Sequence, residues 1–281
     1  WEFILRADKL QKENEHQIKF DFKEIPFSFA KYRDEINKVK PDAIIFFLHL
    51  KNIVFWPLIH WAKLRKIPTI FWTKGLNLDA ADSKIRYVVF NYIHTLSDAL
   101  IMYSQHEKGF LWPNNRAKAF TANNAINYHD FPVINESKQE IKREFGIPFE
   151  KVVLFAGRIN IGGGRKKVDH LIKIFQEIIE PGLGLVIVGA GMSGELQNIL
   201  NKRNTLYLGE VHDPLYIKIS KLFKMADVFS IPGHLGLGVN QAFYWGLPVV
   251  TEEGLHPPEA RYLVDNRNGF IVPENDVQEL K

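Results

Sequence analysis

The chain has 281 residues, with 36 Lys and Arg against 32 Asp and Glu, and it has no Cys. The absence of Cys excludes a disulfide scaffold, a thiolate zinc site and a Cys nucleophile. With 46% hydrophobic and 24% charged residues, the composition is that of a globular protein and excludes collagen-like, disordered and coiled-coil chains. The net charge of +4 suits phosphate-bearing ligands or an anionic membrane face, and it is too small to indicate nucleic acid. The length predicts two domains, each with its own core.

The most apolar stretch of the chain, Ala43–Ala62, is long enough for a membrane-spanning helix. Lys51 lies near its middle, where a charged side chain costs about 2.5–3.5 kcal/mol in a bilayer, and Pro57 interrupts the remainder. The pattern instead predicts a buried strand over 43–48 followed by a helix over 52–66. Because this helix has a basic end, contact with a membrane surface is an alternative to plain packing against a sheet.

Short apolar runs rich in β-branched residues alternate with segments of helical periodicity along the whole chain. The predicted strands are 43–48, 68–72, 99–103, 152–156, 185–188, 205–208, 227–231, 248–251 and 270–272. The predicted helices are 52–66, 83–96, 169–179, 193–202, 215–225 and 239–245. Strict alternation of this kind predicts βαβ units, and therefore an α/β fold with parallel sheets covered on both faces.

The boundary between the two domains is expected in the segment 135–149. Ser137 and Glu140 have the spacing of a capping box at the start of a short helix, and Gly146 can end that helix in the left-handed conformation. We therefore expect an N-terminal domain over 1–147 and a C-terminal domain over 148–281. Both ends of the chain have the character of cut ends, so the first domain is expected to be incomplete and the second to lack its last helices.

In doubly wound sheets, ligands bind at the carboxyl ends of strands, so the strand-to-helix turns are the candidate sites. The turn after 152–156 contains Gly157, three consecutive glycines at 162–164, and four cations, Arg158, Arg165, Lys166 and Lys167. A pyrophosphate needs backbone N–H donors together with guanidinium and ammonium charge. The turn therefore favours a phosphate site over a flexible basic loop. It is not a P-loop, because the GxxxxGK[ST] pattern is absent.

The turn after 185–188 reads as GxGxxG, with Gly189, Gly191 and Gly194. An acidic residue, Glu210, follows the next strand at the distance expected for binding a ribose. This pattern leaves NAD binding open. Dinucleotide folds usually carry it after the first strand of the domain, however, and here it follows the second.

The turn from Pro232 to Gln241 is also rich in glycine and leads into a helix that ends at Gly246. The N-terminus of that helix is a further candidate for anion binding, because its first backbone N–H groups are free and its dipole favours negative charge.

Taken in order, these turns resemble the retaining glycosyltransferases of the GT-B group known as family 4. The resemblance covers about 152–273, with weaker matches back to Pro41. The family's GR…KGxDxLI segment is matched by Arg158, Lys166 and 168–172, its VGxGP turn by 188–191, and its FLGxV loop by 208–211. Its ADVFVxPS segment is matched by 226–232, its EAMAxGxPVV segment by 241–250, and its NGxLVP segment by 268–273. Gly254, Pro258 and Glu259 match a lengthened GGxPE loop, and 124–131 matches the PNGVD connector in degraded form.

This resemblance implies a GT-B fold, in which two Rossmann-like domains face a cleft. A nucleotide diphosphate sugar would bind on the second domain, and the acceptor mainly on the first. Arg158 and Lys166 would hold the diphosphate and offset charge on the leaving group. The other implied donor-binding residues are Gly157, Gly189, Gly191, Leu208, Gly209, Val211, Gly236, Leu237, Gly238, Gln241 and Glu259. No metal and no further cofactor is expected, because two cations and a helix terminus supply positive charge and no DxD motif is present.

Several positions depart from the family pattern. The paired glutamates of the family fall on Gly233 and Gln241, and the glycine after its lysine is Lys167. Gln241 can bind a ribose only by neutral hydrogen bonds, worth about 1 kcal/mol against about 1.5–3 for charged ones. His234 can contact sugar or phosphate in place of the missing glutamate, or it is a half-buried loop histidine. Glu259 either reaches the donor or is a solvated loop carboxylate.

In the first domain the resemblance begins only near Pro41, so the family's opening strand and glycine-rich loop are expected to be missing. His49 follows the strand 43–48, where the family often has a histidine near the reacting sugar, although a structural role is the alternative. Lys74 and Asn77 follow the strand 68–72 and are expected to line the acceptor cleft.

The resulting hypothesis is a retaining transfer of a hexose from a nucleotide diphosphate sugar to a glycan or lipid-linked acceptor. The resemblance implies bacterial polysaccharide biosynthesis in the cytoplasm, with the inner membrane face as a further location. An NAD-linked oxidoreductase using the GxGxxG turn is one alternative. A non-catalytic protein that binds sugar nucleotides or glycans is another. No nucleic-acid partner is expected, because the basic residues are dispersed.

Overall fold

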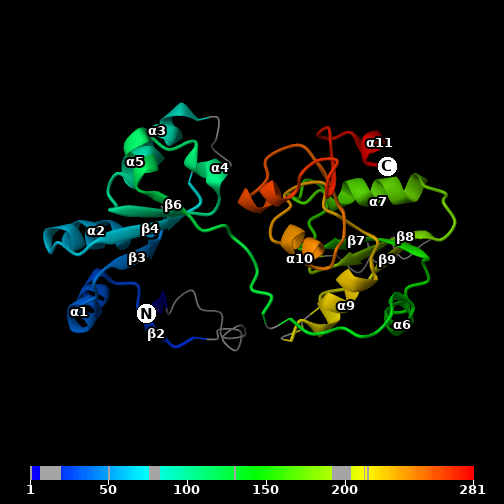
Figure 1. Cartoon of the computed structure of the whole chain (residues 1–281), viewed down its shortest axis with the longest axis horizontal. Helices are drawn as coiled ribbons and strands as arrows, with labels where there is room; N and C mark the ends of the chain where they lie inside the picture. The colour runs from blue at the N-terminus through cyan, green and yellow to red at the C-terminus, as the bar shows by residue number, and fades with distance from the viewer. Residues whose placement is uncertain are drawn as a thin grey trace. The chain divides into compact units, whose positions relative to one another are not determined.

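The structure is a computed structural model, and it describes residues 2–6, 20–49, 51–75, 83–129, 131–191, 204–211, 213 and 215–281. The chain divides into two units, Trp1–Asn123 and Asn124–Lys281 (Figure 1). Both units alternate strands and helices, and every strand pair is parallel. The predicted α/β class is confirmed.

The first unit contains a separate parallel pair of strands and a four-stranded parallel sheet of order β3-β4-β5-β6. The strands are β1 (Phe3–Arg6), β2 (Phe22–Ile25), β3 (Ile44–Phe47), β4 (Thr69–Thr73), β5 (Ala99–Met102) and β6 (Ala119–Thr121). The helices are α1 (Phe29–Val39), α2 (Phe55–Leu64), α3 (Lys84–His94), α4 (Gln105–Lys108) and α5 (Pro113–Ala117). The sequence predicted β3, α2, β4, α3 and β5, and it missed the other six elements.

The helix α2 shows where the apolar side chains of the stretch 43–62 lie in the structure. Leu58, Ile59 and Ala62 are at most 1% exposed and face the core of the first unit. Packing against the sheet is therefore confirmed for the apolar side of this helix. Among the described residues, no helix has both the length and the apolar character needed to cross a membrane.

Only one face of the sheet β3–β6 is buried. Phe46, Phe71 and Leu100 pair across this sheet and are at most 4% exposed. The next row of the same strands runs Phe47, Trp72, Ile101 and Phe120. In this row Phe47 is 50%, Trp72 42% and Phe120 67% exposed. The prediction of a sheet covered on both faces is wrong for this unit as far as it is described.

The second unit contains a six-stranded parallel sheet of order β12-β11-β10-β7-β8-β9. Its strands are β7 (Lys151–Ala156), β8 (Leu183–Val188), β9 (Thr205–Tyr207), β10 (Val228–Ser230), β11 (Val249–Glu252) and β12 (Gly269–Val272). Its helices are α6 (Lys138–Glu144), α7 (Val168–Glu177), α9 (Ile217–Met225), α10 (Gly238–Tyr244), the 3₁₀-helix η3 (Pro258–Tyr262) and α11 (Val277–Leu280). Apart from the helix expected over 193–202, which lies outside the described residues, every predicted element of this half is present.

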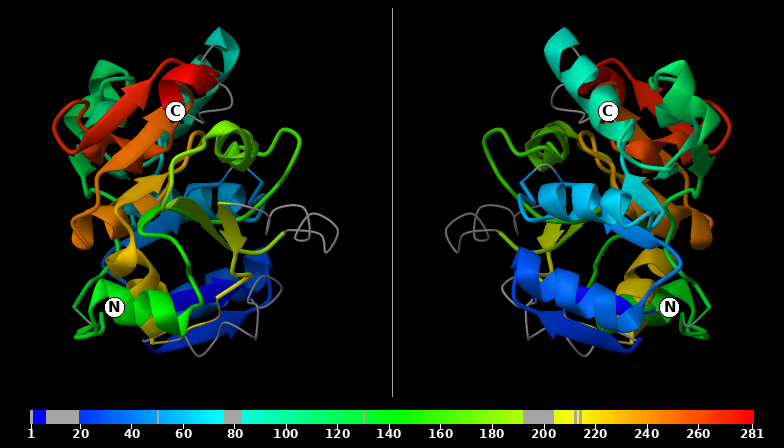
Figure 2. Two further views of the ribbon diagram at one scale, coloured as in Figure 1. Left: turned by 90° about the vertical axis from the view of Figure 1, so that its right-hand side faces the viewer. Right: turned by 90° about the vertical axis from the view of Figure 1, so that its left-hand side faces the viewer.

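The core of the second unit lies on both sides of its sheet. The helix α7 packs on one side and α9 on the other (Figure 1; Figure 2). Leu154 and Phe155, which are adjacent on β7 and therefore point to opposite faces, are both fully buried. This double cover is the environment that continuous apolar strands require.

The connecting segment 124–147 belongs to the second unit and not, as predicted, to the first. Lys138 donates to the Asp227 carboxylate at 2.6 Å and to the Ala226 carbonyl at 2.8 Å. Lys224 donates to the carbonyl of Ile134 at 2.5 Å. The capping box at Ser137 is confirmed, and so is the positive φ of 63° at Gly146.

Candidate functional site

The order of strands in the second unit places two glycine-rich turns next to each other. The strand β7 lies between β8 and β10, so the strand order reverses at β7. The turns that follow β7 and β10 leave from this switch point, at the carboxyl edge of the sheet. Open α/β sheets bind ligands in the crevice at this position.

The turns after β7 and β8 are joined backbone to backbone. The N–H of Gly157 donates to Val188 O at 2.9 Å, and the N–H of Ile159 donates to Ala190 O at 2.8 Å. A Cβ atom on Gly189, whose φ is +144°, would lie 1.9 Å from the Gly157 carbonyl oxygen. One on Gly191 would lie 2.1 Å from the Ile159 carbonyl oxygen. The close approach of two protein backbones therefore explains why glycine is needed at these two positions, without invoking a bound dinucleotide.

The ammonium group of Lys166 lies over the start of the turn that follows β7. A Cβ atom on Gly157 would lie 2.8 Å from Cε and 3.2 Å from Nζ of Lys166. The ammonium donates to the carbonyl of His234 at 3.3 Å, and no carboxylate within the described ranges pairs with it. Burial lowers the pKa of Lys166. A partly buried cation without a counter-ion is a favourable place for an anion.

Arg158 follows Gly157 directly and is exposed. No hydrogen bond or ion pair to another described residue engages its guanidinium group. The structure thus brings the two predicted cations, Arg158 and Lys166, to the same turn of the second unit. Lys166 is held against the backbone, and the guanidinium group of Arg158 is available to a ligand.

The turn after β10 docks onto the end of the turn after β7. The N–H of His234 donates to Arg165 O at 2.7 Å, and the N–H of Gly233 donates to Lys166 O at 3.2 Å. A Cβ atom on Gly233 would lie only 2.1 Å from the Arg165 carbonyl oxygen. Glycine therefore stands here, at a glutamate position of the family pattern, because the two backbones touch. Burial, followed by the positive charges of Lys166 and Arg165, lowers the pKa of His234, so its ring is neutral at neutral pH.

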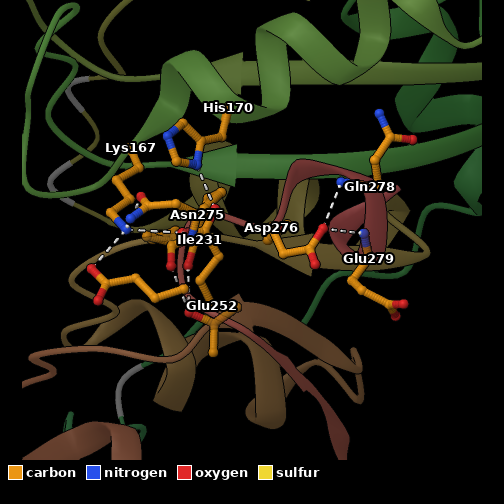
Figure 3. A network of polar contacts seen from close by, with 12 residues as sticks. Lys167, His170, Ile231, Glu252, Asn275, Asp276, Gln278 and Glu279 are labelled. Carbon is orange, nitrogen blue, oxygen red and sulfur yellow. Dashed lines mark hydrogen bonds and ion pairs between the residues drawn. The ribbon is translucent and has the colours of Figure 1, made fainter.

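A buried carboxylate holds the start of α7 (Figure 3). Glu252, the last residue of β11, is 0% exposed and accepts from Lys167 Nζ at 2.9 Å, His170 Nδ1 at 2.5 Å and the Asn275 N–H at 2.9 Å. Lys167 has a φ of 49°, and its ammonium also contacts Glu274 at 3.1 Å. Burial alone would raise the pKa of Glu252, but the three donors outweigh it and hold that pKa below its usual value. This network fixes the backbone directly after the candidate phosphate-binding lysine.

Glu259 is 6% exposed in η3, so the expectation of a solvated loop carboxylate is wrong. Its carboxylate accepts a hydrogen bond from the side chain of Asn124. The hydroxyl of Tyr262 donates to the Asn124 carbonyl at 3.0 Å. Glu259 therefore fastens the connector to the second unit. Its electrostatic effect also reaches His234.

The remaining predicted donor-binding residues follow strands of the same sheet. Gly236 and Leu237 directly precede α10, and Gly238 and Gln241 lie within its seven residues. Leu208, Gly209 and Val211 follow β9, and the Gly209 carbonyl accepts from the Gly189 N–H at 2.9 Å. Their roles in binding stay predictions.

The predicted acceptor-side residues belong to the first unit. His49 is exposed after β3, and its Nδ1 accepts from the Lys51 N–H at 3.3 Å. Lys74 is exposed after β4, with its ammonium 5.6 Å from the ring centre of Tyr103. Asn77 lies outside the described residues. These residues are not in the unit that carries Arg158 and Lys166.

Within the residues that the structure describes, no cluster of three or more His, Asp or Glu side chains is arranged to hold a metal ion.

The second unit is similar to one known family. Residues 150–281 match the family model described as "Glycosyl transferases group 1". Spore coat protein SA of Bacillus subtilis (strain 168) is 28% identical over 151 residues, which make up 48% of this chain and 38% of that protein. The chain thus aligns with well under half the length of this curated relative.

Solved structures resemble the fold over most of the length of this chain. Glycosyltransferase from Rickettsia africae ESF-5 has a TM-score of 0.74 at 14% identity, over 99% of this chain and 77% of that chain. Anabaena Alr3699/HepE in complex with UDP has a TM-score of 0.69 at 17% identity, over 90% and 70% of the two chains. Sucrose-phosphate synthase from Thermosynechococcus elongatus has a TM-score of 0.66 at 19% identity, over 90% and 65%. Identities this low show the fold, and the fold is that of GT-B glycosyltransferases with Rossmann-like domains. The predicted fold class is thereby confirmed.

Proposed function

We propose that this chain transfers a hexose from a nucleotide diphosphate sugar to a glycan or lipid-linked acceptor, with retention at the anomeric carbon and without a metal ion. One observation carries the proposal. The ammonium of Lys166 is partly buried at the switch point of the second sheet, lies over a glycine backbone and lacks a carboxylate partner among the described residues. An anionic ligand with at least two phosphates would supply the missing counter-charge and engage the neighbouring Arg158.

The proposed chemistry follows from this placement. Lys166 and Arg158 bind the diphosphate and stabilise the negative charge that develops as the bond between the anomeric carbon and the phosphate oxygen breaks. The departing phosphate takes the proton of the acceptor hydroxyl, whose oxygen bonds to the same face of the sugar. The neutral ring of His234 donates a hydrogen bond to the sugar or to a phosphate oxygen. His49, Lys74 and Asn77 bind the acceptor.

The comparisons favour a uridine nucleotide as the first ligand to test. Solved relatives of this fold include Anabaena Alr3699/HepE in complex with UDP-glucose and TarM in complex with UDP. A cytoplasmic site of action, with contact at the inner face of a membrane, would give such an enzyme access to lipid-linked acceptors.

Isothermal titration calorimetry with UDP and UDP-glucose tests the binding step. Lys166→Met keeps the aliphatic stem that packs on Gly157 and removes the charge, and Arg158→Ala removes the second cation. Each is expected to weaken binding about 10- to 100-fold, because a charged hydrogen bond is worth about 1.5–3 kcal/mol. Lys173→Ala, an exposed lysine on α7, is the matched control and should bind as the wild type does. Unchanged affinity in both site variants would end the proposal.

A turnover assay separates an enzyme from a non-catalytic binding protein. Gly233 removes one acidic side chain of the family pattern, which is the specific observation in favour of a binder. Release of UDP from UDP-glucose, with or without a sugar acceptor, supports the transferase. Binding without any release supports the non-catalytic alternative.

The NAD-linked alternative has lost its main support. Gly189 and Gly191 are occupied in contacts with the turn after β7, and their turn follows the second strand of the unit rather than the first. A change in nicotinamide fluorescence on mixing the protein with NADH would restore this alternative.

A further inference from the structure

The connecting segment begins with a residue that the 3₁₀-helix η3 holds at two atoms. Asn124 is the first residue of the second unit. Its side-chain amide donates to the Glu259 carboxylate, and its carbonyl accepts from the Tyr262 hydroxyl at 3.0 Å. Because both its backbone and its side chain are engaged, the amide of Asn124 is held in one orientation against Glu259.

The carboxylate of Glu259 has one occupied oxygen and one open oxygen. Oε1 accepts from Asn124, and within the described ranges no other hydrogen bond or ion pair engages the side chain. Oε2 is not one of the buried atoms that lack a partner, so it remains accessible although the residue is only 6% exposed. Glu252, by contrast, is 0% exposed and fully used by its three donors. Glu259 can therefore accept a further hydrogen bond from a ligand.

The helix η3 lies beside the candidate phosphate site. It packs against α10, and Tyr262 shares a hydrogen bond with the side chain of Asn240 on that helix. The turn that leads into α10 carries His234. Burial and the charge of Lys166 lower the pKa of His234, and the negative charge of Glu259 opposes this effect. Glu259 is thus within electrostatic reach of the residue that docks beside the phosphate-binding lysine.

The chemistry of Glu259 selects the part of a nucleotide sugar that it can meet. A carboxylate only accepts hydrogen bonds, so it repels phosphate oxygens and pairs with hydroxyl groups. A neutral amide is a suitable group to orient it, because the amide donates without neutralising the carboxylate. A lysine or arginine in the place of Asn124 would compete with the ligand for the charge.

We propose that Asn124 is a positioning residue for the donor sugar, and that its amide orients Glu259 so that the open oxygen accepts a hydrogen bond from a sugar hydroxyl. The inference rests on the proposed function, because it needs a nucleotide sugar bound at Lys166. It gives the connecting segment a part in recognition of the donor.

Isothermal titration calorimetry with UDP-glucose and with UDP tests the proposal, because UDP has the same base and phosphates and lacks the sugar. Glu259→Gln and Asn124→Ala should each weaken binding of UDP-glucose about tenfold, since a charged hydrogen bond is lost or misdirected. Binding of UDP should change by less than about twofold in both variants. A merely structural role would weaken both ligands alike, so the ratio of the two affinities is the readout, and the affinity for UDP shows that the second unit is folded.

A double variant shows whether Asn124 acts through Glu259. Asn124→Ala/Glu259→Gln should bind UDP-glucose about as well as Glu259→Gln alone, because the amide has no effect without the carboxylate that it orients. Asn123→Ala changes the exposed neighbouring asparagine and is the matched control, which should bind both ligands as the wild type does.

Equal weakening of UDP and UDP-glucose in Asn124→Ala would overturn the proposal, and so would a double variant whose loss is the product of the two single losses. If Glu259→Gln binds UDP-glucose as the wild type does, Glu259 only fastens the connecting segment. A wild-type chain that binds UDP and not UDP-glucose leaves Glu259 without a sugar and overturns the proposal as well. A wild-type chain that binds neither ligand contradicts the proposed function itself, so the two failures are distinguishable.

Discussion

The two sheets of this chain are both parallel, yet they are covered differently. In the second unit, neighbouring residues on β7 such as Leu154 and Phe155 are both fully buried. In the first unit, Phe46 is 4% exposed while the adjacent Phe47 is 50% exposed. The strand order explains the contrast. The order β3-β4-β5-β6 advances in one direction, so right-handed crossovers place every connecting helix on the same face.

In the second unit the order reverses at β7, so crossovers leave toward both faces. The same reversal brings together the turns that carry Lys166 and His234, at the position where open α/β sheets bind ligands. The double cover and the position of the candidate site thus have one topological cause. The described sheet of the first unit has no reversal, and its strand order therefore indicates no comparable site.

Alanine substitutions at adjacent strand residues should give the largest effects and test the contrast directly. Leu154→Ala and Phe155→Ala are both expected to lower the free energy of unfolding by roughly 2–5 kcal/mol, since each leaves a cavity in a packed core. In the first unit, Phe46→Ala should cost roughly 3–5 kcal/mol, whereas Phe47→Ala should cost less than about 1 kcal/mol.

Urea unfolding followed by circular dichroism and tryptophan fluorescence measures these values. Five of the six tryptophans lie in the first unit, so fluorescence reports mainly on that unit. If Phe47→Ala costs as much as Phe46→Ala, the open face is covered in solution and the contrast between the sheets disappears.

These pairs also show where sequence reasoning succeeds and where it stops. Apolar runs and helical periodicity located β3 and β7 equally well, because each reports on local backbone preference. They could not separate the two faces of β3 and β4, because Phe47 and Trp72, which are exposed, are as apolar as the buried residues of these strands. Whether helices cover one face or both faces of a sheet depends on the strand order, and no local sequence pattern encodes the strand order.

The candidate site shows the same limit. The cluster of cations around Lys166 was visible because its members are close in sequence. The partnership of Glu252 with Lys167 and His170 was not, because 85 and 82 positions separate the residues. The available signal was a pair of consecutive acidic residues, Glu252 and Glu253, at the end of a buried strand. Likewise, the sequence suggested that Gly233 marks the loss of a glutamate side chain. The structure shows that glycine stands there because its backbone contacts the backbone of Arg165.

A second test concerns the backbone contacts between the turns after β7 and β8. Gly189→Ala should lower the free energy of unfolding by at least about 3 kcal/mol, because the added Cβ overlaps a backbone oxygen in addition to the strain of a positive φ. Gly146→Ala is the matched control, with a φ of +63° and open space around the Cβ, and should cost only about 1 kcal/mol. UDP binding should weaken in the first variant alone. Equal costs would mean that the two turns do not touch in solution.

The smallest expected effect concerns the network around Glu252, which ties β11 to the start of α7. Glu252→Gln keeps the shape of the side chain and removes its charge, so it should cost about 1–2 kcal/mol at pH 7. Glu253→Gln, at the exposed neighbouring residue, is the control and should change stability by less than about 0.5 kcal/mol.

The dependence on pH identifies the charge as the cause. Because the folded-state pKa of Glu252 lies below the ordinary value of 4.5, its carboxylate stabilises the fold at pH values above 4.5. This contribution is lost as the pH falls below 4.5 and through the folded-state pKa. The difference between the wild type and Glu252→Gln should therefore be constant from pH 7 to about pH 5 and shrink below that. A difference that persists unchanged in acid would show that packing, and not the buried carboxylate, holds Lys167 and the turn that carries Lys166.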